Sequence, residues 1–141
     1  MENHSLEVTR VINAPLDRVW RAWTDPAEMQ KWYAPENLTT PEAEVDLKVG
    51  GAYRIAMQGD DGAHVAVGTF SIIEAPRTLA FSWRWEGSPE GETRVMLTFE
   101  EIEGGKTKVT LRHEGFADDK AKAMHTQGWE STFNKLEKYL A

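Results

Sequence analysis

Hydrophobic and polar residues alternate along most of the chain, and three stretches replace that alternation with a helical repeat. Residues 6–12 repeat with period two, which is typical of a β-strand. Pro15, a favoured first helical residue, then opens a short amphipathic helix. Asp25 and Pro26 begin a second short helix with a capping pattern, and Pro35 ends it. The apolar members of the first helix are Leu16, Val19, Trp20 and Trp23.

Residues 38–116 return to the β pattern and predict six more strands. Gly68 is expected to bulge or bend the strand from His64 to Ile73, and a one-residue bulge reverses the face of every later side chain. The apolar residues that define the strands are Val45 and Leu47; Tyr53, Ile55 and Met57; Ile73; Leu79, Phe81, Trp83 and Trp85; Val95, Leu97 and Phe99; and Val109 and Leu111.

A long helix is predicted from about Asp118 to Leu140, with apolar residues over half of its circumference. Such a wide face fits a helix that lies in the concavity of a curved sheet. The prediction is therefore a single α+β domain over residues 1–141 with a helix-grip architecture. A seven-stranded antiparallel sheet would curve around the C-terminal helix, and two short helices would follow the first strand.

Gly128 and His125 break the pattern on the apolar face of this helix. A glycine in mid-helix costs about 1 kcal/mol relative to alanine. Gly128 indicates either a close approach to a strand or a tryptophan, or a space left for a ligand. His125 is either a core histidine bonded to a tyrosine, serine or carbonyl group, or a polar group inside a pocket. The six tryptophans raise the same alternative of filled core against cavity wall.

Charge and composition narrow the classes of partner. The net charge of −7 opposes binding to a phosphate backbone, so we expect no nucleic-acid partner. The N-terminal residues lack the layout of a signal peptide, and no apolar run approaches the ~18 residues of a membrane span. The absence of cysteine excludes disulfides and thiolate sites. We therefore expect a cytoplasmic protein, either a monomer or a homodimer.

Motifs that carry chemistry are missing from the sequence. It contains no zinc-binding histidine pair on a helix, no phosphate-binding glycine loop and no serine nucleophile elbow. His64, His113 and His125 could meet in space, but their spacing does not require it. Glu100, Glu101 and Glu103 are typical of a solvated strand edge. No catalytic residue, metal site or cofactor is predicted, and an enzyme is less favoured than a binding protein.

Several motifs nonetheless occur in a recognisable order along nearly the whole chain. They are the run Thr9 to Pro15, the run Val19 to Ala22, Thr24-Asp25-Pro26 with Trp32, the run Asp46 to Gly51, Asp61-Gly62, Gly68 and Gly128-Trp129. Together they resemble the START-like superfamily, also called SRPBCC, and most closely its branch named for the activator of the heat-shock-ninety chaperone ATPase. The resemblance implies a helix-grip fold with an internal cavity and an apolar or lipid-like ligand.

The first functional hypothesis is a module that binds a small apolar molecule between the sheet and the last helix, entered near the short helices. The residues expected to line that cavity are Trp32, Tyr33, Tyr53, Met57, Trp83, Trp85, Met96, His125 and Gly128. The second hypothesis is a domain that binds a chaperone or another protein. The third is a cyclase-type or hydrolase-type enzyme with His125 or His113 as general base.

Overall fold

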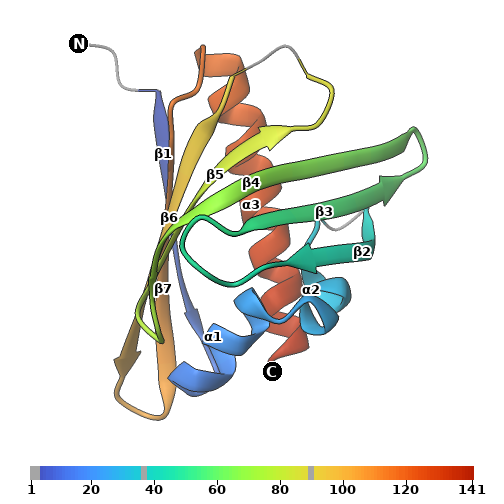
Figure 1. Ribbon diagram of the computed structural model, residues 1–141. Coiled ribbons are helices and arrows are strands. Elements are labelled where there is room, and N and C mark those ends of the chain that lie inside the picture. The colour runs from blue at the N-terminus through green and yellow to red at the C-terminus, as the bar shows by residue number, and fades with distance from the viewer. Residues whose placement is uncertain (1–3, 36–37, 89–90) are drawn as a thin grey trace.

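The computed structural model describes residues 4–35, 38–88 and 91–141. The chain forms a curved sheet with one long helix across it and two short helices at one end (Figure 1). The strands are β1 (Ser5–Ile12), β2 (Thr39–Val45), β3 (Ala52–Gly59), β4 (Gly62–Glu74), β5 (Thr78–Trp85), β6 (Thr93–Ile102) and β7 (Lys106–Glu114). The helices are α1 (Leu16–Thr24), α2 (Pro26–Trp32) and α3 (Asp119–Tyr139).

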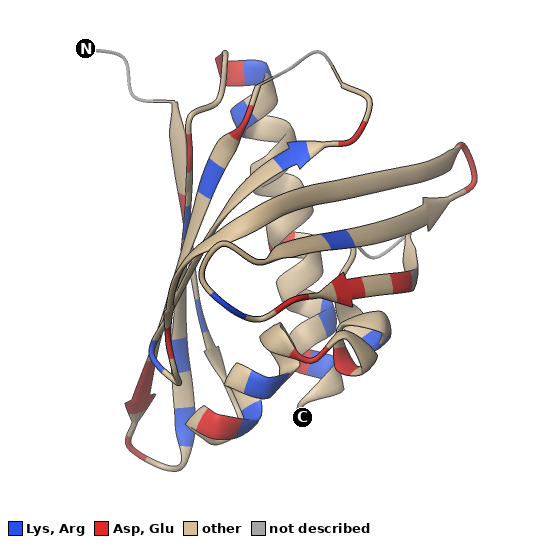
Figure 2. Cartoon of the chain, viewed as in Figure 1, with Lys and Arg blue, Asp and Glu red and all other residues tan. Residues whose placement is uncertain are grey.

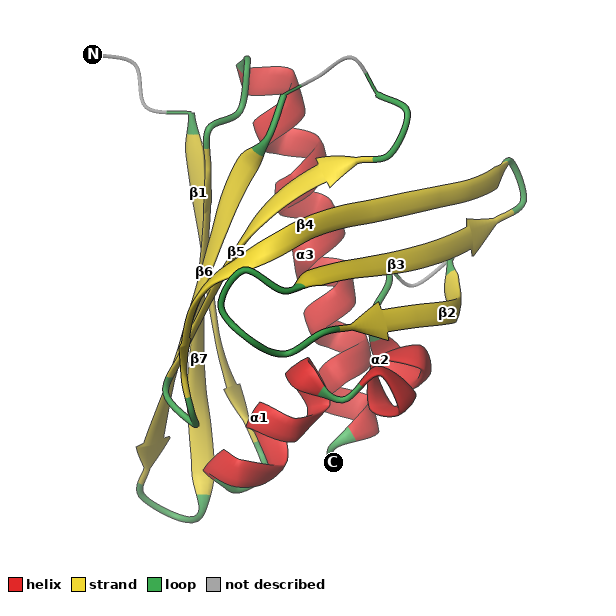
Figure 3. Ribbon diagram, in the orientation of Figure 1, coloured by secondary structure: helices red, strands yellow, loops and turns green. Residues whose placement is uncertain are grey.

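The seven strands form one antiparallel sheet in the order β1-β7-β6-β5-β4-β3-β2. Each strand from β2 to β6 pairs with the next one along the chain, and β7 also pairs with β1, which forms an edge of the sheet. Figure 3 shows the sheet curving around α3, with α1 and α2 near the C-terminal end of that helix. This arrangement confirms the α+β helix-grip fold.

Helix α3 covers the concave side of the sheet with the face predicted from its sequence. Asp118 caps the helix by accepting a hydrogen bond from the backbone N–H of Ala121, at 2.8 Å. The side chains of Trp129, Phe133 and Leu136 are buried against the core. The N-terminal half of the helix is less buried, because Met124 is 62% exposed and His125 is only half-buried.

An aromatic cluster joins the three helices to the sheet. The ring of Trp23 lies 4.7 Å from that of Trp32, 5.7 Å from that of Tyr33 and 6.3 Å from that of Trp129, measured between centroids. The contacts of Trp23 with Trp32 and Tyr33 are edge to face, and such contacts add to the hydrophobic gain from burying large rings. Phe133 packs on the same ring of Trp23 from α3. These contacts show that at least part of the tryptophan content fills the core.

A polar cluster fastens the outer ends of the same helices. Glu28 of α2 accepts hydrogen bonds from Arg21 Nε of α1 at 2.8 Å and from the Tyr139 hydroxyl of α3 at 2.9 Å. Arg18 pairs with the same carboxylate. Burial alone would raise the pKa of Glu28, but the hydrogen bonds from these three side chains lower it. Figure 2 shows the basic positions along α1 and the acidic positions along β2.

Two local expectations need correction. Strand β2 ends at Val45, and Leu47 lies beyond it with 42% exposure. Of the bulge or bend expected at Gly68, the bulge is wrong, because the register of β4 against β5 shifts between Phe70 and Ile72. Gly68 has a different role, because a Cβ atom at this position would overlap the carbonyl group of Ser82 in β5. The glycine therefore permits the two strands to approach each other where the sheet curves.

Replacing Gly68 with alanine is expected to lower the free energy of unfolding by about 1–3 kcal/mol, because backbone must move to accommodate the methyl group. Gly91 supplies the matched control, since a Cβ atom there meets nothing within 4 Å. Urea unfolding followed by circular dichroism measures both variants. Equal midpoints for Gly68→Ala and Gly91→Ala would contradict the steric role of Gly68.

Candidate ligand pocket

A pocket of about 410 Å³ lies between β5 and the middle of α3. The segment between α2 and β2 and the start of β4 complete its walls. Its volume falls in the range of small-molecule sites, roughly 300–1,000 Å³. The lining residues are Tyr33, Pro35, Leu38, His64, Trp83, Trp85, Ser88, Met124, His125, Gly128, Trp129 and Thr132.

Local structure explains how the segment after α2 reaches the pocket. Tyr33 ends α2, and its backbone N–H donates to the Met29 carbonyl at 2.9 Å. Pro35 cannot continue the helix because it lacks a backbone N–H. The Lys135 ammonium group of α3 donates to the Leu38 carbonyl at 2.9 Å and thereby holds this segment against the helix. The side chains of Tyr33, Pro35 and Leu38 all border the pocket.

Gly128 lines the pocket without a close neighbour. A Cβ atom built at this position would meet only the Pro35 ring, at 3.9 Å, which is an ordinary van der Waals distance. A close approach to a strand or a tryptophan, the first of the two interpretations of this glycine, is therefore wrong. The missing side chain leaves space between α3 and the opposite wall.

A buried relay of hydrogen bonds supports the back of the pocket. The indole N–H of Trp129 donates to Nδ1 of His113 at 3.0 Å. Since indole can only donate, His113 carries its proton on Nε2 and donates it to the Thr93 hydroxyl at 2.6 Å. Thr93 in turn donates to the carbonyl group of Trp83 at 2.8 Å. Burial, with a smaller contribution from His125, lowers the pKa of His113 to about 3, so its ring is neutral.

His125 lies between this relay and the pocket. Its Nε2 atom accepts a hydrogen bond from the indole N–H of Trp85 at 3.2 Å. Its Nδ1–H therefore donates to the Ala121 carbonyl at 2.8 Å. Both interpretations of His125 meet here, because the ring bonds a backbone carbonyl and also lines the pocket. The rings of His113 and His125 lie 5.3 Å apart.

One polar group in the pocket wall has no such partner. The hydroxyl group of Tyr33 makes no hydrogen bond with any residue that the structure describes, although the residue is only 3% exposed. Burial raises the pKa of Tyr33 well above its ordinary value, so the hydroxyl keeps its proton. A ligand or water that accepted a hydrogen bond from this hydroxyl would therefore be favoured. The indole N–H of Trp83 also lacks an acceptor among the described residues, but it is fully buried and does not open on the pocket.

The nine residues expected from the sequence separate into three groups. Five of them line the pocket, namely Tyr33, Trp83, Trp85, His125 and Gly128. Three lie in the core outside this lining, namely Trp32, whose indole donates to the Ala22 carbonyl, Tyr53, whose hydroxyl donates to the Ser82 carbonyl, and Met57. Met96 alternates with the buried residues Val95 and Leu97, and therefore lies on the outer face of β6.

The sequence contains signals for some pocket residues outside the predicted set. Met124, Trp129 and Thr132 lie on the apolar half of the long helix, next to His125 and Gly128. Pro35, Leu38 and Ser88 come from irregular segments, where no periodicity indicates which way a side chain points. His64 borders the pocket from the start of β4, although its sequence context suggests only a possible metal ligand.

The described residues contain no group of three or more potential metal ligands. The rings of His113 and His125 do converge, but all four ring nitrogens already have hydrogen-bond partners. Those of His113 bond Trp129 and Thr93. Those of His125 bond Trp85 and the Ala121 carbonyl.

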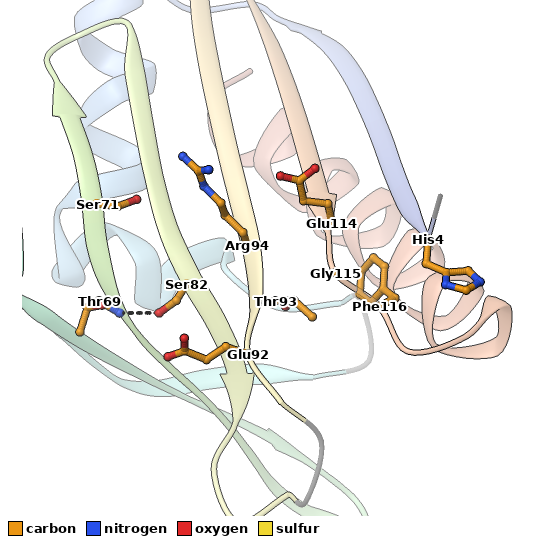
Figure 4. Close-up of a pocket in the computed structure, with 10 residues that line it drawn as sticks. All are labelled: His4, Thr69, Ser71, Ser82, Glu92, Thr93, Arg94, Glu114, Gly115 and Phe116. Carbon is orange, nitrogen blue, oxygen red and sulfur yellow. Dashed lines mark hydrogen bonds between the residues drawn. The ribbon is translucent and has the colours of Figure 1, made fainter. Parts of the chain in front are cut away.

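A larger hollow of about 870 Å³ lies on the other face of the sheet. Figure 4 shows polar side chains from neighbouring strands around it, among them Ser71, Arg94 and Glu114. These strand residues are exposed or half-buried. The smaller pocket is the better candidate for a ligand, because it is walled by aromatic rings and bordered by the Tyr33 hydroxyl, which has no partner among the described residues.

This fold and pocket define a helix-grip protein of the START-like class. The chain belongs to the family described as Activator of Hsp90 ATPase homolog 1-like protein, whose family model matches residues 13–141. The family resemblance noted from the sequence is therefore confirmed. No curated protein matches the sequence. In the part of the chain that the structure describes, no helix combines the length and apolar character needed to cross a membrane.

Solved structures agree with this assignment. CalU16 from Micromonospora echinospora is 30% identical with a TM-score of 0.74, and the match covers 97% of this chain and 76% of that one. The AHSA1 protein from Silicibacter pomeroyi is 25% identical with a TM-score of 0.84 over 96% of both chains. A protein from Chromobacterium violaceum is 23% identical with a TM-score of 0.86, covers 97% and 96%, and supports the fold alone.

The buried neutral state of His113 predicts a dependence of stability on pH. Its pKa rises from about 3 in the folded protein to the ordinary 6.5 on unfolding. As pH falls below about 6.5, the unfolded chain binds a proton that the folded protein does not, and the free energy of unfolding decreases. The contribution lost between about pH 7 and pH 5 is about 2 kcal/mol.

His113→Gln removes this titration, whereas wild type and variant share every carboxylate, so the pH dependence of the carboxylates cancels between them. The stability advantage of the wild type over His113→Gln should therefore shrink by about 2 kcal/mol between about pH 7 and pH 5. Urea titrations at several pH values measure it. A difference independent of pH would show that the His113 ring is not held neutral by burial.

Proposed function

We propose that the protein binds a small apolar molecule in the pocket between β5 and α3. The observation that carries the proposal is the gap at Gly128, which faces a wall of aromatic rings instead of a packed strand. A helix-favouring residue with a side chain would stabilise α3 by about 1 kcal/mol and fill part of this space. The glycine is therefore explained better by a ligand than by packing.

The catalytic alternative receives less support from the geometry. A general base needs a free lone pair within reach of the substrate. In His113 and His125, one ring nitrogen accepts an indole N–H and the other carries a proton that is donated within the protein. Either histidine would have to break an existing hydrogen bond before it could accept a proton. The chaperone-associated role follows from the family's description alone and stays a prediction.

Filling the gap tests the proposal. Gly128→Phe places a ring in the pocket and is expected to weaken binding of the neutral fluorescent probe 1-aminoanthracene by about 10-fold or more, which corresponds to about 1.4 kcal/mol. The increase in probe fluorescence on titration with protein gives the dissociation constant. Gly128→Leu serves as a smaller substitution should the phenyl ring distort the helix.

The matched control is Ala123→Phe, which adds the same ring at an exposed position of α3. This variant should bind the probe like the wild type, and thermal unfolding should show that both variants remain folded. Unchanged affinity in a folded Gly128→Phe protein would place the probe elsewhere and refute the proposal.

A further inference from the structure

Aromatic rings dominate the walls of the pocket. The centroids of Trp83 and Trp129 lie 5.2 Å apart, and those of Trp83 and Trp85 lie 5.4 Å apart with the planes at 80°. Tyr33 meets Trp129 edge to face, with centroids 6.0 Å apart. Rings arranged in this way present both faces and edges to the space between them. A flat aromatic molecule makes offset and edge contacts with such a surface, which a flexible alkyl chain cannot make.

The pocket wall has no charged residue free to pair with a ligand. None of its described lining residues is a lysine, arginine, aspartate or glutamate. Its two histidines already have partners, because His64 contacts the Asp61 carboxylate and His125 bonds Trp85 and the Ala121 carbonyl. Transfer of an ionised carboxylate or ammonium group from water into such surroundings is strongly unfavourable without a partner. The geometry therefore disfavours fatty acids and other ionised ligands, even though their apolar parts would fit.

One polar group of the wall is left for a ligand. The hydrogen-bonding groups of Thr132, His125 and Trp129 are engaged within the protein. The Tyr33 hydroxyl has no partner among the described residues, and it can donate to a ligand oxygen. Tyr33 also borders a void of about 10 Å³ beside Tyr53, just large enough for one water molecule. A ligand oxygen and that water are the two groups that could satisfy its hydroxyl.

We infer that the pocket selects an uncharged aromatic molecule that carries a hydrogen-bond-accepting oxygen, such as a ketone, quinone or ester. This inference rests on the proposed function and narrows its ligand class. Tyr33 is the specificity-determining residue, because its hydroxyl is the one that donates to the ligand oxygen. Trp83, Trp85 and Trp129 hold the aromatic plane.

Three probes of nearly the same shape test this class. Fluorenone carries a carbonyl oxygen, fluorene lacks it, and fluorene-9-carboxylate is charged. Quenching of tryptophan fluorescence gives the three dissociation constants, since the pocket wall contains indoles. The wild type should bind fluorene-9-carboxylate at least about 100-fold more weakly than fluorenone.

Tyr33→Phe removes only the hydroxyl group and keeps the ring. It should weaken binding of fluorenone by about 10-fold while changing that of fluorene by less than about twofold. Tyr139→Phe is the matched control, because the Tyr139 hydroxyl donates to Glu28 instead of bordering the pocket. It should leave both affinities unchanged.

Selective loss of fluorenone affinity in Tyr33→Phe supports the inference. If Tyr33→Phe binds both fluorene and fluorenone as tightly as the wild type does, water satisfies the Tyr33 hydroxyl. This result overturns the inference and leaves the proposed function standing. Equal binding of fluorenone and the carboxylate also overturns the inference alone. Failure of all three fluorene-type probes to bind a wild type that binds 1-aminoanthracene would overturn the inference alone. Failure of 1-aminoanthracene as well would overturn the proposed function together with the inference.

Discussion

One helix cannot cover the whole concave side of a curved seven-stranded sheet, and the rest of the structure follows from this limit. At one end, α1 and α2 add Trp23 and Trp32 to the core, and the C-terminal half of α3 packs closely through Phe133 and Leu136. At the other end the described residues form no further helix over the sheet, and α3 presents His125 and Gly128 to it. The pocket therefore lies beyond the part of the concave side that is filled by the side chains of α1, α2 and the C-terminal half of α3.

A space of this kind persists only if its walls are rigid, and the buried hydrogen bonds supply that rigidity. The relay from Trp129 through His113 and Thr93 to the Trp83 carbonyl links α3 to β5, β6 and β7. The bond from Trp85 to His125 links β5 to α3 a second time. Each donor in these chains has an acceptor, which makes the walls costly to rearrange. The Tyr33 hydroxyl lines the pocket without a partner among the described residues and differs in this from the groups of the relay.

The sequence predicted the fold because each level of its pattern agreed. Alternation defined the strands, Asp25 and Asp118 marked helix starts, and the wide apolar face of the last helix required a sheet around it. The pocket was predictable where a residue broke a local rule: Gly128 and His125 were both found in this way.

Other features depended on geometry that one sequence does not contain. Residue type alone could not tell Tyr33, at the pocket, from Tyr53, in the core, because both are buried tyrosines and only the Tyr53 hydroxyl has a partner, the Ser82 carbonyl. The prediction for Met96 was wrong, because the period-two pattern with the buried residues Val95 and Leu97 places Met96 on the outer face of the strand. The register shift at Ser71 left no signal, since the glycine that suggested it, Gly68, serves a close approach instead.

The measurement that bears most directly on a ligand pocket between β5 and α3 is nuclear magnetic resonance of the protein with 1-aminoanthracene. Our account predicts intermolecular nuclear Overhauser effects from the probe to the Gly128 Hα protons and to the rings of Tyr33 and Trp83, all of which line one space. Effects confined to exposed apolar side chains such as Val11 and Val49, with none to Gly128, would contradict it.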